Sequence, residues 1–249
     1  MDERLIDYTL MLADSSLIMG HRLSEWTGHG PALELDIAIS NIALDYVGQA
    51  RNFYQYAALL KGNVATEDSL AYMRDERAYK NLLLTELPNG DWAQSILKIF
   101  FYANYQFHLY QQLVDCRDVQ LSAIAEKSLK EASYHVRWSS DWVIRLGDGT
   151  EESHQRTHKA LDEIWNYTGE LTMKPTYDMG FVDYERLKNS WLQKTNLVLD
   201  AATLSLPKNE KNQPVWMHRG GTEGKHTEHL GFILAEMQYL QRSYPNSEW

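Results

Sequence analysis

Two short phrases in this sequence place a glutamate and a tyrosine three residues apart, at Glu76/Tyr79 and at Glu131/Tyr134. Residues three apart on an α-helix share a face, so each phrase presents a carboxylate beside a phenol. His135 directly follows the second phrase. Helix bundles that hold two iron ions carry Glu-x-x-His on two helices and one Glu on each of the other two. The phrases therefore predict either a metal centre or a polar cluster in its place.

The number of available ligands bears on these two interpretations. Both histidine positions of the iron motif hold tyrosine, and a phenol that titrates near pH 10 is a poor ligand for ferrous iron. His135 lies four residues after Glu131, about 100° past the direction of the i+3 position. Between Asp91 and Asp115 there is no acid at all, and Lys98 and His108 are the readily charged residues there. Asp45 is the remaining candidate ligand, so the set is incomplete.

Three interpretations of these residues remain. The first is a buried, hydrogen-bonded network in the position of a lost metal centre, made of Asp45, Glu76, Tyr79, His108, Glu131, Tyr134 and His135. The second is a set of surface acids, the usual location of charged helical residues, paired with nearby arginines such as Arg74. The third is a di-iron oxygenase with Asp45, Glu76, Glu131 and His135 as ligands. We expect the first, with no catalytic residue and no metal ligand in this chain.

The elements that position these residues are helices, because apolar residues recur at steps of three and four along nearly the whole chain. We expect helices at about 5–26, 33–60, 66–86, 91–116, 118–146, 154–171, 183–206 and 226–242. Thr66, Asp118 and Asp183 are suited to cap three of them. The helix at 91–116 is apolar nearly all round and should be buried.

No strand-like alternation accompanies these helices, so the predicted fold is all-α. The helices between about 33 and 147 are long enough for an antiparallel four-helix bundle, flanked by the first helix and by C-terminal helices at about 154–243. We predict a single domain over residues 1–249. A polar line on the helix at 33–60, through Asn41, Asp45, Gly48 and Asn52, is either a water-facing strip or the wall of a polar channel.

Composition excludes several classes of protein. The net charge of −10, from 34 acids against 24 bases, argues against a nucleic-acid-binding protein. The single cysteine, Cys116, allows no intrachain disulfide and no cysteine metal cluster. The start of the chain lacks the basic segment and apolar run of a signal peptide, and no apolar stretch is long enough to span a membrane. We therefore expect a cytoplasmic protein.

Two further stretches bear on partners. His226-Thr-Glu-His229 lacks the spacing of the zinc motif His-Glu-x-x-His, so we assign it to helix capping or to an interface. The long polar segment 207–225 is of a kind that is usually functional, mobile or ordered by a partner. This segment and the helices at 5–26 and 91–116 are the predicted interface candidates.

Several motifs resemble the C-type subunit of the bacterial multicomponent phenylacetyl-CoA ring epoxidases, over essentially the whole chain. They are Gly28-His-Gly-Pro31, Leu44-Asp-Tyr-Val-Gly-Gln-Ala-Arg-Asn52, Arg74-Asp-Glu-Arg77, Glu86-Leu-Pro-Asn-Gly90, Lys225-His-Thr-Glu-His-Leu-Gly231 and Ala235-Glu-Met-Gln-Tyr-Leu-Gln241. The resemblance implies a ferritin-like helical protein that lacks the iron of its relative, the catalytic or A-type subunit. In that family the catalytic subunit holds the di-iron centre and binds phenylacetyl-CoA.

The resemblance also implies a set of partners. The C-type subunit pairs with the catalytic subunit in a structural role, and a small B-type subunit together with a reductase completes the system. The overall reaction uses oxygen and electrons from NADPH to epoxidise the aromatic ring of phenylacetyl-CoA, an early step of aerobic phenylacetate breakdown. The expected role is thus a non-catalytic subunit without a cofactor of its own. A free-standing acyl-CoA-binding module is a further alternative, and a homodimer is a possible state of the isolated chain.

Overall fold

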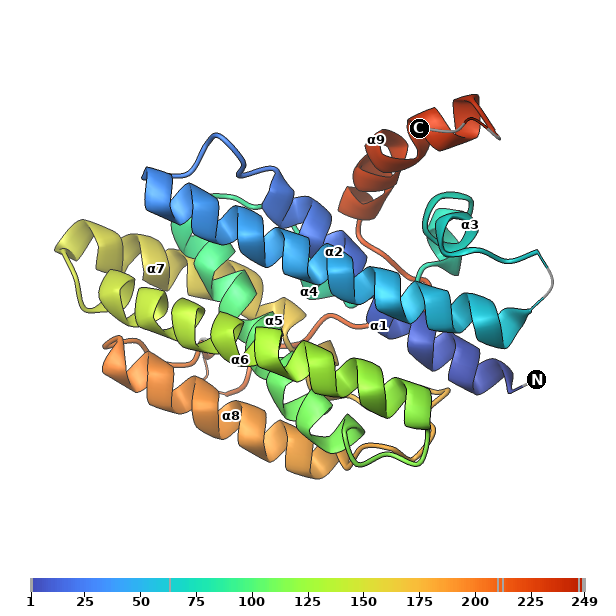
Figure 1. Cartoon of the computed structure of the whole chain (residues 1–249). Coiled ribbons are helices and arrows are strands. Elements are labelled where there is room, and N and C mark those ends of the chain that lie inside the picture. The colour runs from blue at the N-terminus through green and yellow to red at the C-terminus, as the bar shows by residue number, and fades with distance from the viewer. Residues whose placement is uncertain (1, 63, 210, 212, 246, 248–249) are drawn as a thin grey trace. The chain divides into compact units, whose positions relative to one another are not determined.

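The structure, a computed structural model, describes residues 2–62, 64–209, 211, 213–245 and 247 (Figure 1). Its elements, in chain order, are α1 (Glu3–Ser24), α2 (Leu33–Lys61), α3 (Glu67–Tyr72), η1 (Glu76–Ala78), α4 (Leu83–Glu86), α5 (Trp92–Leu113), α6 (Val119–Gly147), α7 (Glu151–Ile164), η2 (Trp165–Tyr167), η3 (Gly169–Thr172), α8 (Tyr184–Ala201), η4 (Gly221–Glu223) and α9 (Glu228–Ser243). Within these described ranges, β-structure is limited to an isolated bridge between Lys208 and Pro214. The all-α prediction is confirmed.

The chain divides into two compact units. The first comprises Met1–Pro88, Pro175–Met179 and Gly220–Trp249, and the second comprises Asn89–Lys174 and Gly180–Arg219. The first unit contains α1 to α4 and α9, and the second contains α5 to α8. The expectation of one domain over residues 1–249 stays a prediction.

In the first unit, α1 and α2 pack side by side as a helical hairpin (Figure 1). Ile18 and Met19 of α1 and Ile39 and Tyr46 of α2 are completely buried. Gly20 allows the close approach of the two helices, because a Cβ atom there would lie 2.9 Å from Cγ2 of Val47 and 3.1 Å from the carbonyl oxygen of Ala43. The hairpin is the scaffold on which the rest of this unit is ordered.

The helix predicted at 66–86 is broken into α3, η1 and α4. The backbone N–H of Lys80 donates to Oδ2 of Asp14 at 2.8 Å, and that of Leu82 donates to Oγ of Ser15 at 3.1 Å. Side chains of α1 thus take the place of the acceptors that a continuous helix would supply. Tertiary hydrogen bonds override the helical pattern of this segment.

The second unit is built on the hairpin of α5 and α6 (Figure 1). Helix α5 is buried on nearly all sides, as its apolar sequence predicts. Helix α8 is bound to it by polar groups: Nε1 of Trp191 donates to the carbonyl oxygen of Phe101 at 3.0 Å, and Nδ2 of Asn104 donates to the carbonyl oxygen of Trp191 at 3.0 Å. The stretch predicted as helix at 154–171 is α7 followed by the short turns η2 and η3.

The predicted N-caps are confirmed. Thr66 and Ser69 form a reciprocal capping box at α3. Oδ1 of Asp118 accepts from the backbone N–H of Leu121 at 2.8 Å at the start of α6, and Asp183 accepts from two backbone N–H groups at the start of α8. A capping residue of this kind typically stabilises a helix by about 1 kcal/mol.

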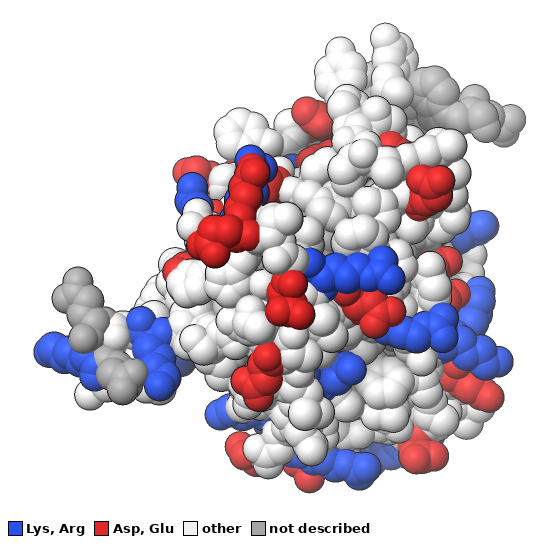
Figure 2. Space-filling model, turned by 90° about the vertical axis from the view of Figure 1, so that its left-hand side faces the viewer, with Lys and Arg blue, Asp and Glu red and all other residues white. Residues whose placement is uncertain are grey.

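The surface carries charges of both signs. On the face shown in Figure 2, Lys and Arg side chains are interspersed with Asp and Glu side chains, and uncharged residues cover much of the remaining area. This face therefore lacks the continuous basic stripe that nucleic-acid binding requires. Among the described helices, none combines the length and apolar character needed to cross a membrane.

Candidate functional site

The predicted residues of the first unit occupy different environments. Tyr79 is completely buried, Asp45 is half-buried on α2, and Glu76 is exposed on η1. The prediction that Glu76 belongs to a buried network is wrong. The helix that was expected to turn this side chain inward ends at Tyr72, and the following 3-10 turn leaves Glu76 at the surface.

The predicted residues of the second unit also separate. On α6, His135 is completely buried and Glu131 is half-buried, whereas Tyr134 is 42 % exposed. The inclusion of Tyr134 in a buried network is therefore wrong. The buried face of this part of α6 passes through Ala132, His135 and Ser139, and Tyr134 lies about 100° away from His135 around the helix.

His108 lies on α5 with its ring half-buried. Its Nδ1 is 3.2 Å from Oε1 of Gln111, the next turn of the same helix. Burial lowers the pKa of His108 below its usual value, and the hydrogen bond to Gln111 opposes this only in part. The imidazole is therefore neutral at pH 7 and contributes a polar contact rather than a charge.

The candidate iron ligands do not fit a di-iron centre. In the part of the chain that the structure describes, no group of three or more His, Cys, Asp or Glu side chains is arranged to hold a metal ion. Glu76 lies at the surface on a 3-10 turn rather than within a long helix, and α5 contains no acidic residue between Trp92 and Leu113. The absence of a cofactor from this chain stays a prediction.

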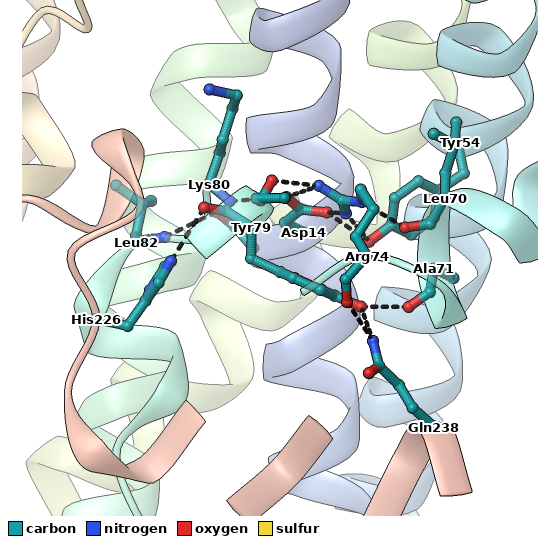
Figure 3. Close-up of polar contacts among 12 residues, drawn as sticks. Asp14, Tyr54, Leu70, Ala71, Arg74, Tyr79, Lys80, Leu82, His226 and Gln238 are labelled. Atoms are coloured by element: carbon teal, nitrogen blue, oxygen red, sulfur yellow. Dashed lines mark hydrogen bonds and ion pairs between the residues drawn. The ribbon is translucent and has the colours of Figure 1, made fainter. Parts of the chain in front are cut away.

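A buried ion pair is the centre of the polar network in the first unit (Figure 3). The Asp14 side chain is completely buried and lies in the middle of α1. Its Oδ2 accepts from Nη1 of Arg74 at 3.0 Å, and its Oδ1 accepts from Nη2 of the same guanidinium and from the hydroxyl of Tyr54 at 2.6 Å. Both carboxylate oxygens are therefore hydrogen-bonded, as a buried charge requires.

Arg74 also orders the segment from which it projects. Its Nε donates to the carbonyl oxygen of Leu70 at 2.5 Å, and its Nη1 donates to that of Ala78 at 2.7 Å. Burial alone would lower the pKa of Arg74, but the charge and hydrogen bonds of Asp14, together with the nearby Tyr54 and Tyr79, outweigh this effect and raise it. The guanidinium is thus permanently charged and holds both ends of the turn between α3 and η1 against α1.

Tyr79 is linked to this pair through its ring and its hydroxyl. The guanidinium carbon of Arg74 lies 4.3 Å from the centre of the Tyr79 ring, close enough for a cation–π contact. The hydroxyl donates to the carbonyl oxygen of Ala71 and accepts from Nε2 of Gln238 on α9 at 3.0 Å. Burial raises the pKa of Tyr79 above its usual value, so the phenol stays protonated. The network thus extends from α1 to α9 (Figure 3).

A second buried carboxylate, Glu86, fixes the start of α9. Its Oε2 lies 3.0 Å from Nδ1 of His226 and accepts from Nδ2 of Asn81 at 2.8 Å, and its Oε1 accepts from the backbone N–H of Thr227 at 2.5 Å. The side chains of Glu86 and His226 are both completely buried. The segment at 226–229 therefore serves capping and an internal contact, since Thr227 is also the N-cap of α9.

Both carboxylates are engaged in contacts within the first unit. Asp14 is paired with Arg74, and Glu86 is paired with His226, so neither is poised to take a proton from a substrate. Sequence reasoning named Arg74 and Tyr79 but missed Asp14 and Glu86. The sequence signal for a buried acid was its position within an apolar helix, as with Asp14 in Leu10-Met-Leu-Ala-Asp14. The partner of Asp14, Arg74, is 60 residues away in sequence, so the pair leaves no local pattern.

The second unit contains a cavity of about 990 Å³. Trp165 and Trp191, stacked with ring centres 5.9 Å apart, are among the residues that line it. Much of the wall is apolar and includes Met173, Val182, Leu192, Leu206, Val215 and Met217. Three exposed lysines, Lys174, Lys188 and Lys208, and the acids Asp183 and Glu185 also line it. Its volume is at the upper end of the range for small-molecule sites.

Two comparisons with known proteins give matches that span all or nearly all of the chain. The family model described as phenylacetic acid catabolic protein matches residues 1–249. The chain is 44 % identical over 252 residues to the protein of Escherichia coli strain K12 that is named as the C subunit of 1,2-phenylacetyl-CoA epoxidase, covering 99 % of both chains. The motifs around Glu86 and His226, which carry part of the resemblance in sequence, meet in space in the buried pair described above. By this full-length match, the chain belongs to the phenylacetic acid catabolic protein family, whose fold is ferritin-like and helical.

Proposed function

We propose that this chain is the structural, non-catalytic subunit of a 1,2-phenylacetyl-CoA epoxidase and supports a separate, di-iron catalytic subunit. The identity of 44 % over 99 % of both chains to the E. coli epoxidase component supports the assignment to such a complex. In this role the chain takes part in aerobic phenylacetate breakdown in the cytoplasm, together with the catalytic subunit, the small B-type subunit and a reductase.

One observation carries the non-catalytic part of the proposal. The long helices retain polar residues at candidate ligand positions, but the set is incomplete: α5 contributes no carboxylate, and the acid expected from Glu76 lies at the surface of η1. Of the three candidate carboxylates, two, Asp45 and Glu131, are half-buried, and two carboxylates fall short of the number that a di-iron site needs. The same count disfavours a di-iron oxygenase in this chain.

Reconstitution tests the proposal. The purified catalytic and small subunits, together with the reductase, are assayed for NADPH-dependent epoxidation of phenylacetyl-CoA with and without this chain. We expect turnover only when the chain is present, and we expect metal analysis to assign the iron to the catalytic subunit. Iron near two atoms per molecule of this chain, with oxygen consumption by this chain and reductase alone, would contradict the proposal.

A second function, binding of an acyl-CoA by this chain itself, is favoured by the cavity of the second unit. Apolar walls suit an acyl group, and Lys174, Lys188 and Lys208 suit the phosphates of coenzyme A. Calorimetry with phenylacetyl-CoA tests it. If the cavity binds this ligand, Lys188→Glu weakens binding several-fold, whereas Arg186→Glu, the same charge change on α8 outside the cavity lining, leaves it unchanged.

A further inference from the structure

A second pocket, of about 480 Å³, lies within the second unit. Residues of α5, α6 and α8 line it, and none of them lines the cavity of about 990 Å³ described above. Its volume falls within the range of small-molecule sites. Neither of the functions proposed above uses this pocket, so its lining was considered for a ligand of its own.

Charged side chains give the pocket an excess of one positive charge. Arg137 of α6 and Lys194 of α8 line it, against one acid, Asp141. Within the described part of the chain, neither cation forms a salt bridge with a carboxylate. His108 also lines the pocket and is neutral, because burial and the nearby charge of Lys194 both lower its pKa. In a chain whose net charge is −10, this lining favours a ligand with a single negative charge.

Two polar atoms of the lining residues are buried without a hydrogen-bond partner among the described residues. They are Oγ of Ser140, a residue that is 5 % exposed, and Nε2 of His108. Nδ1 of His108 lies 3.2 Å from Oε1 of Gln111, which can only accept, so Nδ1 carries the proton and Nε2 presents a lone pair. Buried polar groups are rarely left unsatisfied in native proteins, so a hydroxyl donor and a lone pair at one pocket indicate a polar ligand.

Apolar side chains complete the lining. Phe107 of α5, Val136 of α6 and Leu197 of α8 contribute to it, and Leu197 is 62 % exposed. Ligand sites commonly combine an apolar wall with a few polar groups that fix the orientation of the ligand. The apolar part of the wall suits a short hydrocarbon or aromatic body.

We propose that this pocket binds a small hydroxy acid, a molecule with one carboxylate, one hydroxyl group and a short apolar body. The carboxylate accepts hydrogen bonds from Arg137, Lys194 and the hydroxyl of Ser140. The hydroxyl group of the ligand donates to Nε2 of His108. Since Oγ of Ser140 and Nε2 of His108 are buried, the ligand reaches them through a change of side-chain rotamer, which is common on binding.

The charge of the pocket argues against a phosphate ester as the ligand. A phosphate monoester carries a charge of about −1.5 to −2 at pH 7, which exceeds the single positive charge in excess. A monocarboxylate matches that excess. This inference does not depend on the function proposed above, since it concerns residues of the second unit that the functional proposal does not use.

The first test compares ligands that each lack one feature. The purified full-length chain is titrated in ligand-detected NMR with each enantiomer of mandelate, with phenylacetate, which lacks the hydroxyl group, with mandelamide, which lacks the charge, and with inorganic phosphate. We expect one enantiomer of mandelate to bind with a Kd of about 0.1–1 mM, and the other three compounds to bind at least about fivefold more weakly. If any of these three binds as tightly as mandelate, or if no compound binds, the inference is wrong.

The second test locates the site with matched variants. Arg137 and Arg145 are both exposed on α6, with their guanidinium carbons 5.8 Å and 5.2 Å from the ring centres of Tyr134 and Trp142, but only Arg137 lines the pocket. Arg137→Gln should weaken mandelate binding about tenfold, and Arg145→Gln should change it less than about twofold. Lys188→Gln, in the wall of the larger cavity, should also change it less than about twofold. Weakening by Lys188→Gln but not by Arg137→Gln would place mandelate in the larger cavity and overturn the inference.

The third test uses two neighbouring serines. Oγ of Ser139 donates to the carbonyl oxygen of His135 at 2.6 Å, whereas Oγ of Ser140 has no partner among the described residues. Ser140→Ala should weaken mandelate binding several-fold without lowering the urea midpoint of the free chain, because it removes an unsatisfied group. Ser139→Ala should lower the midpoint and leave the affinity unchanged. A lower midpoint with unchanged affinity in Ser140→Ala would show a purely structural role and contradict the inference.

Discussion

Nδ1 of His226 lies 3.0 Å from Oε2 of Glu86, while Nε2 of the same ring lies 3.0 Å from the carbonyl oxygen of Tyr79. A carboxylate and a carbonyl both accept hydrogen bonds, so both ring nitrogens carry a proton and the imidazole is positively charged. This buried cation ties the start of α9 to two points of the segment between η1 and α5. The relationship joins residues that are 140 positions apart.

The Glu86–His226 pair predicts a stability that falls at alkaline pH. Burial alone would lower the pKa of His226, but the hydrogen bond and charge of Glu86 raise it above the usual 6.5. The folded state therefore holds this proton more tightly than the unfolded chain. The stabilisation is complete below about pH 6.5 and is lost as the pH rises through the folded-state pKa. Urea unfolding of the wild type at a series of pH values measures this loss.

The matched variants are His226→Gln and His158→Gln. The first should flatten the fall of unfolding free energy above pH 6.5, because the group that titrates is gone. The second removes a histidine that is 52 % exposed and lies 3.2 Å from Asp162, and it should leave the profile unchanged. A wild-type profile that is retained in His226→Gln would show that another group carries the pH dependence.

The Asp14–Arg74 pair predicts a large cost for neutralising one partner. Asp14→Asn leaves a buried guanidinium without its counter-charge, and the loss of unfolding free energy should be about 3–5 kcal/mol. Tyr54→Phe removes one neutral donor to the same carboxylate and should cost about 1 kcal/mol. Chemical denaturation of both variants measures whether Asp14→Asn loses more unfolding free energy than Tyr54→Phe. Equal losses would show that the charge of Asp14 is not what holds the segment after α3.

Two glycines within helices predict opposite effects of the same substitution. At Gly20 a Cβ atom would lie 2.9 Å from Cγ2 of Val47, so Gly20→Ala should force α1 and α2 apart and destabilise the chain by about 1–3 kcal/mol. At Gly48 nothing lies within 4 Å, so Gly48→Ala should stabilise the isolated chain by about 0.5–1 kcal/mol. Unfolding midpoints in urea measure both, and a stabilising Gly20→Ala would contradict the close packing of the hairpin.

The helical fold could be predicted from the sequence because its signals are local. The caps at Thr66, Asp118 and Asp183 use acceptors two or three residues from the N–H groups they satisfy, and the apolar steps of α5 are visible along the chain. The break of the helix at 66–86 could not be predicted in this way. Its cause is Asp14, which accepts from the backbone N–H of Lys80 across 66 residues of sequence.

The polar network could be predicted only in part for the same reason. Arg74 and Tyr79 stand out in the sequence beside Asp75 and Glu76, whereas their structural partners are Asp14 on α1 and Gln238 on α9. Repetition of the Glu-x-x-Tyr phrase suggests two equivalent helices. The two phrases have different conformations, since the first lies on a 3-10 turn and the second on a long helix. A shared spacing therefore does not imply a shared environment.

The central claim is that this chain supports an epoxidase without carrying out its chemistry, and one measurement tests it most directly. Iron content and phenylacetyl-CoA epoxidation are measured in the same reconstituted complex, with the wild-type chain and with a variant in which Asp45, Glu131 and His135 are replaced by Asn, Gln and Gln. We predict that the variant complex keeps the full iron content of the wild type and its turnover per complex. A parallel loss of iron and turnover from a complex that still assembles would show that these residues bind catalytic metal and would contradict the account.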